Sequence, residues 1–402
     1  MIELTPHGLA NGGEAVAKVD GKTWFIAGAM PGDVVLASIE QDRGSWGRAK
    51  LVEIVQPAPD RVAAPCRHFA SCGGCQWQFI DAETQRVAKG ATVQSQLVHL
   101  GRFDDDVVVR PTLAAGDPYG YRNRMDFRLS GGRPALFKAR SKELEPLDEC
   151  LLLVPALAEL FGRLGDLDGL NFLTIRAGAN TGDLLAVIGG RLPAHAGSWD
   201  VPIGRVRRGV PSVESGRDHL FEEVNGLRFR ITANAFFQNN TVGAGLLVDL
   251  VHEALEPARD DVLLDAYAGG GLFSVALGPQ VSRLVAVETS PLGLADLEHN
   301  LEEADVPAAD IFAAPFEELI DDIESVTIAV CDPPRTGLGA TGVEVLTDCR
   351  PRAIAYVSCD PASLARDARL IADHGYTLDW VAPVDMFPQT HHIESVARFA
   401  LS

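Results

Sequence analysis

Val262-Leu-Leu-Asp-Ala-Tyr-Ala-Gly-Gly-Gly-Leu272 is the stretch of sequence that decides the fold. An apolar run ends at Asp265, a glycine-rich turn follows, and residues 272–277 are expected to be helical. Three further apolar runs, separated by helical segments, lie at 283–288, 326–332 and 353–359. Strands that alternate with helices form a parallel, doubly wound sheet. Residues 231–402 are therefore expected to form a Rossmann-like α/β domain.

The glycine turn is suited to hold a nucleoside cofactor. Glycines let the backbone approach a ligand closely and leave the helix N-terminus free to bind it. Glu288 ends the second strand, 23 residues after Asp265, and a carboxylate there can accept both ribose hydroxyls of an adenosine. No glycine stands three residues beyond Gly271, so the turn departs from the dinucleotide fingerprint. This favours S-adenosylmethionine over NAD, with plain helix packing as the alternative.

Reactive side chains are expected where the later strands end, because ligands of open α/β sheets bind at the carboxyl ends of strands. Asp332 lies in Cys-Asp-Pro-Pro-Arg, where two prolines hold it rigidly. Cys359 lies in Ser-Cys-Asp-Pro and could be a nucleophile if its site lowers the thiol pKa from about 8.5. Glu394, in His-His-Ile-Glu, is a candidate general base. The two adjacent histidines are expected on opposite faces of a strand, which disfavours a metal site formed by that pair.

A cysteine cluster indicates a metal centre. Cys66, Cys72 and Cys75 surround Gly73-Gly74, and Cys150 follows later in the chain. Glycines allow the chain to fold around a metal centre and direct N–H groups at sulfur. The residues alone leave both tetrahedral zinc and a four-iron cluster possible.

The remaining chain divides into two further regions. Residues 1–57 read as short strands, with Asp20-Gly21 as a hairpin turn, and suggest a small OB-like β-barrel. Residues 58–230 mix helix and strand in an expected α+β domain that carries the cysteine cluster. The segment 56–60, Gln-Pro-Ala-Pro-Asp, is the expected linker.

Charge is distributed unevenly along the chain. The net charge of −20 argues against a general nucleic-acid binder. Residues 119–142, however, contain seven basic side chains and one acid, and 296–332 contain twelve acids with no Lys or Arg. The basic side chains are Arg122, Arg124, Arg128, Arg133, Lys138, Arg140 and Lys142. The basic segment is expected to face a polyanion or to be a solvated strand face, and the acidic one to stay solvated.

The sequence contains no apolar run of the ~20 residues that a membrane helix needs. The N-terminus has neither the basic start nor the apolar run of a secretory signal. The seven cysteines are too few for a disulfide scaffold. A cytoplasmic protein without membrane contact is expected.

These combined motifs resemble the bacterial RNA uracil-5-methyltransferases, in particular the branch that acts on 23S rRNA. The resemblance covers nearly the whole chain and implies a TRAM domain that binds RNA at residues 1–57. It also implies a [4Fe-4S] cluster, in preference to zinc, on Cys66, Cys72, Cys75 and Cys150. A methyltransferase domain would occupy residues 231–402, and the chain is expected to act as a monomer.

The same resemblance assigns roles to individual residues. It makes Cys359 the nucleophile that adds to C6 of uracil and Glu394 the base that removes the C5 proton. The residues that it places at the S-adenosylmethionine site are Gln238, Tyr267, Gly269, Gly271, Glu288 and Asp332. Leu272 departs from the polar residue common at that position, which puts one cofactor hydrogen bond in doubt.

Two alternatives to this prediction stay open. A tRNA uracil-5-methyltransferase would use the same chemistry on another RNA. A non-catalytic RNA-binding protein on the same fold would be expected to lack Cys359 or Glu394, and both are present.

Overall fold

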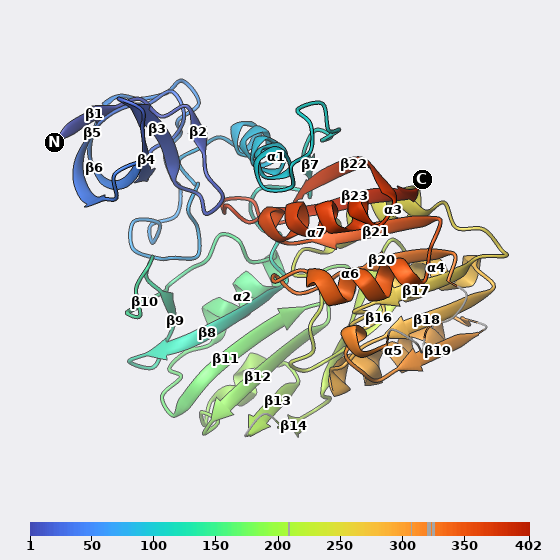
Figure 1. Ribbon diagram of the computed structural model, residues 1–402. Coiled ribbons are helices and arrows are strands. Elements are labelled where there is room, and N and C mark those ends of the chain that lie inside the picture. Colours follow the sequence, from blue (N-terminus) through green and yellow to red (C-terminus); the bar gives the residue numbers. More distant parts are fainter. Residues whose placement is uncertain (208–209, 307, 320–322, 324–325) are drawn as a thin grey trace.

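The structure is a computed structural model that describes residues 1–207, 210–306, 308–319, 323 and 326–402. Its strands form sheets of six, seven, two and eight strands. Figure 1 shows the six-stranded sheet at the upper left, the seven-stranded sheet below it, and the helix-covered eight-stranded sheet to the right. No helix in this described part of the chain is long and apolar enough to cross a membrane.

The first 56 residues form the six-stranded sheet. Its strands are β1 (Ile2–Leu4), β2 (Gly8–Leu9), β3 (Ala15–Val19), β4 (Lys22–Ala27), β5 (Val34–Asp42) and β6 (Trp46–Gln56). Asp20 and Gly21 both have positive φ, which matches the tight turn predicted between β3 and β4. The strand order β1-β5-β6-β4-β3-β2 leaves β1 and β2 as the two edges. The expected closure into an OB-like barrel stays a prediction.

The chain next forms helix α1 (Ala82–His99) and the short strand β7 (Leu113–Ala114). The Asp81 side chain caps α1 by accepting hydrogen bonds from the N–H groups of Glu83 and Thr84. Val93 and Leu97 are fully buried in the core that α7 (Pro361–Asp373) also enters. Strand β7 pairs in parallel with β22 (Tyr376–Asp385). Residues 82–114 therefore pack with the C-terminal sheet, although the sequence placed them in the central domain.

The seven-stranded sheet is formed by the middle of the chain. Its strands are β8 (Arg124–Ser130), β9 (Arg133–Phe137), β10 (Leu144–Pro146), β11 (Leu170–Ala177), β12 (Leu184–Gly190), β13 (Ile203–Arg207) and β14 (Val210–Ser215). All neighbouring pairs are antiparallel except β12 and β13. Helix α2 (Pro155–Arg163) and the 3₁₀ turn Ala196–Trp199 supply residues to its core. The hairpin of β15 (His219–Val224) and β16 (Leu227–Thr232) leads into the C-terminal part.

The eight-stranded sheet has the order β19-β18-β17-β20-β21-β23-β22-β7. The strands not yet given are β17 (Val262–Ala266), β18 (Arg283–Val287), β19 (Ala309–Phe312), β20 (Ile328–Cys331), β21 (Ala353–Ser358) and β23 (Glu394–Leu401). The first five in this order are parallel, but β23 is antiparallel to both of its neighbours. The sheet is therefore mixed, and the expectation of a purely parallel sheet is corrected. The reason is that the short link 386–393 returns β23 directly beside β22, as in a hairpin.

Helices cover both faces of this sheet (Figure 1). The remaining ones are α3 (Thr241–Leu255), α4 (Leu272–Leu277), α5 (Pro291–Glu303) and α6 (Gly339–Asp348). Buried residues of α3, α4 and α5 form one core, and those of α1, α6 and α7 form a second. Because both faces are covered, the carboxyl-terminal edge of the parallel strands is where side chains can meet a ligand.

Candidate active site

The turn after β17 leaves space for a ligand. Tyr267, Gly269 and Gly271 all have positive φ, and the Gly271 N–H donates to the Ala268 carbonyl at 2.8 Å. A Cβ added to Gly269 would have no other atom within 4 Å, so this backbone is open to an approaching molecule. A Cβ on Gly271 would lie 2.8 Å from the Leu297 side chain. Gly271 is therefore needed for helix packing, whereas Gly269 faces the open space.

Tyr267 is held in its left-handed conformation by contacts on its ring and its hydroxyl. Its hydroxyl donates a hydrogen bond to the Glu317 carboxylate. Its ring lies 5.6 Å from the ring of Phe316, both partners coming from the 3₁₀ turn Phe316–Glu318. A non-glycine residue with positive φ persists only where its surroundings hold it. The Tyr267 ring is thus a fixed wall beside the glycine turn.

Carboxylates border the same turn. Glu288 Oε2 accepts the Gly269 N–H at 2.7 Å, and Glu288 Oε1 accepts the Thr289 N–H at 2.7 Å. Asp265 is fully buried, and burial raises its pKa to about 7. Its Oδ2 accepts the Ser274 hydroxyl at 2.6 Å, while its Oδ1 has no hydrogen-bond partner among the described residues. The glycine turn is thus hydrogen-bonded directly to Glu288, the carboxylate that was predicted to hold a ribose.

One cavity of about 510 Å³ collects most of the predicted site. It is lined by the two predicted catalytic residues and by five of the six predicted cofactor residues, Gly271 being the exception. The predicted residues on its wall are Gln238, Tyr267, Gly269, Glu288, Asp332, Cys359 and Glu394. Leu272 also lines it, so the apolar residue that departs from the expected polar one does face the cavity.

Cys359 and Glu394 face each other across neighbouring strands. Ser358 in β21 is paired with Ser395 in β23, so the next position of that register sets Cys359 beside Glu394. Glu394 is only 3% exposed. Burial and the nearby charge of Asp332 raise its pKa well above the ordinary range, which Arg335 partly offsets. These surroundings favour the neutral form of the Glu394 carboxyl.

The surroundings of Cys359 oppose ionisation of its thiol. Burial raises its pKa to about 12, the charges of Glu394 and Asp332 add to the shift, and Arg335 opposes it. A lowered thiol pKa was the condition set for Cys359 as a nucleophile, and the structure shifts this pKa upward instead. A thiolate at Cys359 therefore depends on what binds beside it, and a cationic ligand would favour it.

Asp332 and Gln238 meet across the cavity. The Gln238 amide Nε2 donates to Asp332 Oδ2 at 3.3 Å, and burial raises the pKa of Asp332 to about 7. The segment that carries Gln238 is tied to the start of the seven-stranded sheet. Asn123 Nδ2 donates to the Gln238 carbonyl at 3.2 Å, and the Asn123 N–H donates to the Asn239 carbonyl at 3.0 Å.

Some residues on the cavity wall had no role assigned from the sequence. Arg335 stands in the quoted Cys-Asp-Pro-Pro-Arg motif, and it is the cation that lowers the pKa of both Cys359 and Glu394. Phe236 also lines the cavity and is 66% exposed. The position of Phe236, two residues before Gln238, could have drawn attention to it in the sequence. The exposure of its ring, however, could be known only from the folded structure.

The expectation for the adjacent histidines is wrong. His391 and His392 precede β23, and their rings lie 4.4 Å apart at 39° instead of pointing to opposite faces of a strand. The His392 ring Nδ1 is 3.4 Å from Arg335 Nη2. Burial and the neighbouring cations lower the pKa of His392 to about 3, so its ring is neutral.

The four clustered cysteines line a second cavity, of about 320 Å³. Gly74 donates its N–H to Cys72 Sγ at 3.4 Å, and burial raises the pKa of Cys75 to about 12. A Cβ on Gly73 would lie 2.8 Å from the Phe137 carbonyl oxygen, so only glycine fits there. Within the described ranges, no three His, Cys, Asp or Glu side chains are grouped closely enough to hold one metal ion. The fold thus gathers the cysteines around a space without forming a single-ion site.

The basic segment 119–142 is largely neutralised by acids of the same chain. Four of its seven cations form ion pairs, two of them being Arg124 with Asp126 at 3.0 Å and Arg140 with Glu14 at 2.9 Å. The acidic segment 296–332 is not wholly solvated either, because Asp296 is 1% exposed and accepts the Thr232 N–H at 2.7 Å. Positions 307, 320–322 and 324–325 of that segment lie outside the described residues.

Comparison with known proteins places the chain in a family. The sequence model of the tRNA (Uracil-5-)-methyltransferase family matches residues 216–399. An uncharacterized RNA methyltransferase of Gloeobacter violaceus is 32% identical, over 98% of this chain and 95% of its own. One of Streptomyces avermitilis is 33% identical, over 98% of this chain and 96% of its own. The chain belongs to the RNA uracil-5-methyltransferase family.

The enzyme class predicted from the sequence is thereby confirmed, and membership of a methyltransferase family supports S-adenosylmethionine as the cofactor. A solved structure supports the fold of the enzyme. The tRNA (uracil-54, C5)-methyltransferase of Pyrococcus abyssi, solved with S-adenosyl-L-homocysteine, superposes with a TM-score of 0.78. The similarity covers 99% of this chain and 100% of that one at 22% sequence identity.

Proposed function

We propose that the enzyme transfers a methyl group from S-adenosylmethionine to C5 of a uridine in 23S rRNA through a covalent bond between Cys359 and C6. The observation that carries this proposal is one shared cavity. Cys359 and Glu394 open onto the same space as the glycine turn and Glu288. A nucleophile, a base and a nucleoside-binding edge in one cavity are what this reaction needs.

The residues around the glycine turn fit the cofactor. When bound, S-adenosylmethionine supplies an electrophilic methyl group on a cationic sulfonium. Glu288, which already accepts the Gly269 N–H at 2.7 Å, would hold the ribose hydroxyls. Open space beside Gly269 and the flat ring of Tyr267 leave room for an adenosine. The carboxyl groups of this cavity also favour a cation, which lowers the cost of ionising Cys359.

Each catalytic group has one task in the reaction: Cys359 forms and breaks a bond to C6, and Glu394 removes the C5 proton. C5 of uracil is too weak a nucleophile to take a methyl group directly, so the Cys359 thiolate adds to C6 and the ring becomes an enolate. C5 then attacks the methyl group, and the bond from that methyl group to the sulfonium sulfur breaks, which would leave a neutral thioether. Glu394 removes the C5 proton, and the Cys359–C6 bond breaks to restore the ring. Gln238 is placed to hold the polar edge of uracil while charge develops on its oxygen.

A uridine in folded RNA must leave its stack to reach Cys359. The exposed ring of Phe236 at the cavity is placed to stack on a displaced base. Residues 1–57, as a TRAM-type module, and the basic side chains of 119–142 that remain unneutralised would hold the flanking RNA, with the enzyme acting as a monomer.

We further propose that Cys66, Cys72, Cys75 and Cys150 hold a [4Fe-4S] cluster. In such a cluster each thiolate binds a different iron, so the sulfurs surround a space and do not converge on one ion as in zinc sites. The cavity of about 320 Å³ lined by all four fits the former arrangement. The methyl transfer needs no electron, so the cluster would be structural or would position RNA.

Metal analysis after anaerobic preparation tests the cluster. We expect iron and sulfide in the wild-type protein and loss of both in Cys75→Ser. Cys349→Ser is the control and should retain both, because Cys349 is a half-buried thiol at the C-terminal end of α6, outside the cluster. One zinc per chain without iron or sulfide would contradict the assignment.

A tRNA substrate is the second candidate, and a specific observation favours it. The Pyrococcus abyssi structure that matches the whole chain is that of a tRNA (uracil-54, C5)-methyltransferase. Mapping 5-methyluridine in total RNA from a strain that lacks this gene decides between the two. Loss of the mark from 23S rRNA supports the proposal, loss from tRNA alone supports the alternative, and complementation with Cys359→Ala should restore neither.

A further inference from the structure

The link between β22 and β23, residues 386–393, separates the two cavities. Phe387 lines both of them. Thr390 and His392 line the cysteine cavity, and Glu394, the first residue of β23, lines the methyl-transfer cavity. We call residues 386–393 the 386–393 link. Because Glu394 directly follows this link, its position depends on the contacts that fix the link in place.

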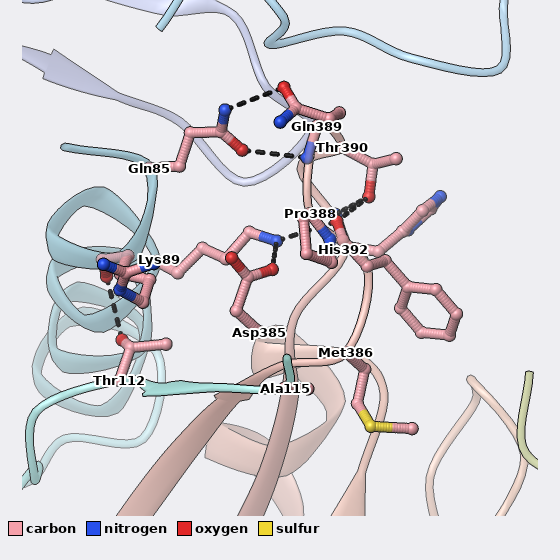
Figure 2. Close-up of polar contacts among 12 residues, drawn as sticks. Gln85, Lys89, Thr112, Ala115, Asp385, Met386, Pro388, Gln389, Thr390 and His392 are labelled. Carbon is pink, nitrogen blue, oxygen red and sulfur yellow. Dashed lines mark hydrogen bonds and ion pairs between the residues drawn. The ribbon is translucent and has the colours of Figure 1, made fainter. Parts of the chain in front are cut away.

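Helix α1 holds the beginning of the link through a buried lysine (Figure 2). Lys89 Nζ donates to Asp385 Oδ1 at 2.6 Å and to the Phe387 carbonyl at 3.1 Å. The side chains of Lys89 and Asp385 are 0% and 3% exposed. A charge-assisted hydrogen bond in so dry a place fixes its partners firmly.

One turn earlier on α1, Gln85 holds the other part of the link. Gln85 Nε2 donates to Gln389 Oε1 at 3.0 Å, and the Gln389 N–H donates to Gln85 Oε1 at 2.9 Å, as Figure 2 shows. Gln389 has a φ of 70°, a conformation that needs such support. Its carbonyl also accepts N–H groups of Gln76 and Trp77, which follow Cys75.

A buried ion pair is weak evidence for stability, because an apolar pair of similar volume often serves as well. Lys89 does something that an apolar residue cannot do. Its ammonium group donates hydrogen bonds that fix the orientation of the Asp385 carboxylate and of the Phe387 carbonyl in the link. A general base must lie within hydrogen-bond reach of the proton it takes, and a 1 Å displacement can cost about 10²-fold in rate.

We propose that Lys89 and Gln85 of α1 are positioning residues that hold the 386–393 link so that Glu394 faces the C5 proton of the bound uridine. The inference rests on the proposed role of Glu394 as the base. Neither side chain lines the methyl-transfer cavity, so each acts through the link and not on the substrate.

The decisive variant is the double substitution Lys89→Met with Asp385→Leu, which removes both charges and leaves no unpaired buried ion. Gln85→Leu tests the other attachment. Arg352→Met is the control, because the Arg352–Asp261 ion pair, 2.7 Å long, lies next to the amino-terminal ends of β17 and β21, and neither residue lines the methyl-transfer cavity. Steady-state methylation of RNA, melting temperature and covalent-adduct formation are measured for each.

For the double variant and for Gln85→Leu we expect kcat to fall about tenfold to a hundredfold. The KM values for S-adenosylmethionine and RNA should stay within about threefold, since the binding surfaces are untouched. The methylated protein–RNA adduct should accumulate, because removal of the C5 proton becomes the slow step. Arg352→Met should leave kcat and adduct levels as in the wild type.

The outcomes separate this inference from the function on which it rests. If the double variant folds with a melting temperature near that of the wild type and turns over at the wild-type rate, Lys89 does not position Glu394. If it is too unstable to assay, normal turnover in a folded Gln85→Leu protein refutes the inference equally. If Glu394→Gln itself turns over normally, the proposed base is wrong, whatever the α1 variants do.

Discussion

Replacing Glu394 by glutamine should slow the step that follows methyl transfer. Glu394 is 3% exposed, and its raised pKa already favours the neutral form in the free protein. Glutamine keeps its size and its neutral charge but cannot accept a proton. Cys359 can therefore still add to C6, and C5 can still take the methyl group, but the C5 proton stays in place.

The expected size of the effect follows from the surroundings of Glu394. General-base catalysis contributes about 10²–10⁴-fold, which corresponds to about 3–5 kcal/mol of the barrier. Asp332 lines the same cavity, and burial raises the pKa of its carboxyl. Because Asp332 can act as a partial substitute base, we expect a loss near the lower end of this range, about 100-fold in kcat.

The stability of this variant has a predicted direction. A carboxyl whose pKa rises on folding loses stabilisation as pH rises above its unfolded value, for which 4.5 is the ordinary figure. Glutamine does not ionise and escapes this loss. Glu394→Gln should therefore melt at or above the wild-type temperature at pH 8, and the difference should shrink toward pH 5.

The assay is denaturing electrophoresis of the enzyme with RNA and methyl-labelled S-adenosylmethionine. We expect a slow-migrating protein–RNA band that carries the label, and Cys359→Ala in the same chain should abolish it. Ser395→Ala is the matched control, since its buried hydroxyl is next in sequence and has no hydrogen-bond partner among the described residues. Normal turnover without an adduct would refute the role of Glu394, and an adduct without label would place Glu394 before methyl transfer.

Three further outcomes are expected. Cys359→Ala should lose methylation by at least about 10³-fold while calorimetry still detects S-adenosylhomocysteine binding, because the thiol acts on the ring and does not hold the cofactor; residual activity near the wild-type rate would exclude the covalent route. Since burial raises the pKa values of Cys359 and Glu394, both reactive ionised forms increase with pH, and kcat/KM should rise from pH 6 to pH 9. A flat profile would show that neither ionisation limits the free enzyme. Glu288→Gln should raise the KM for S-adenosylmethionine about tenfold or more with a smaller change in KM for RNA, and an unchanged cofactor KM would remove Glu288 from the ribose site.

Part of the candidate active site could be predicted from the sequence, because ligands of open α/β sheets bind at the carboxyl ends of parallel strands. Asp265, Glu288, Asp332 and Cys359 each stand at or next to the end of an apolar run, and the carboxyl ends of parallel strands share one edge of a sheet. The structure places all four at that edge, from β17, β18, β20 and β21. Glu288, Asp332 and Cys359 line the cavity, whereas Asp265 is fully buried and does not. Spacing and residue type therefore predicted part of the cavity wall.

The other part depends on contacts between distant segments. Glu394 reaches Cys359 only because β23 is inserted antiparallel between β21 and β22, a choice that local periodicity does not specify. Gln238 precedes α3 and is fixed from the central sheet by Asn123. A lowered thiol pKa was the condition set for Cys359 as a nucleophile, but burial and carboxylates from other strands raise that pKa.

The sequence by itself determined the alternating α/β pattern, the glycine turn and the chemical types of the reactive side chains, because these depend on local periodicity and on residue identity. Only the tertiary structure decided that α1 and β7 join the C-terminal sheet, that Lys89 is buried against Asp385, and that Arg140 of the basic segment pairs with Glu14. Each of these contacts joins segments that are far apart in the sequence. Burial depends on the whole packed chain, so no local pattern of residues encodes it.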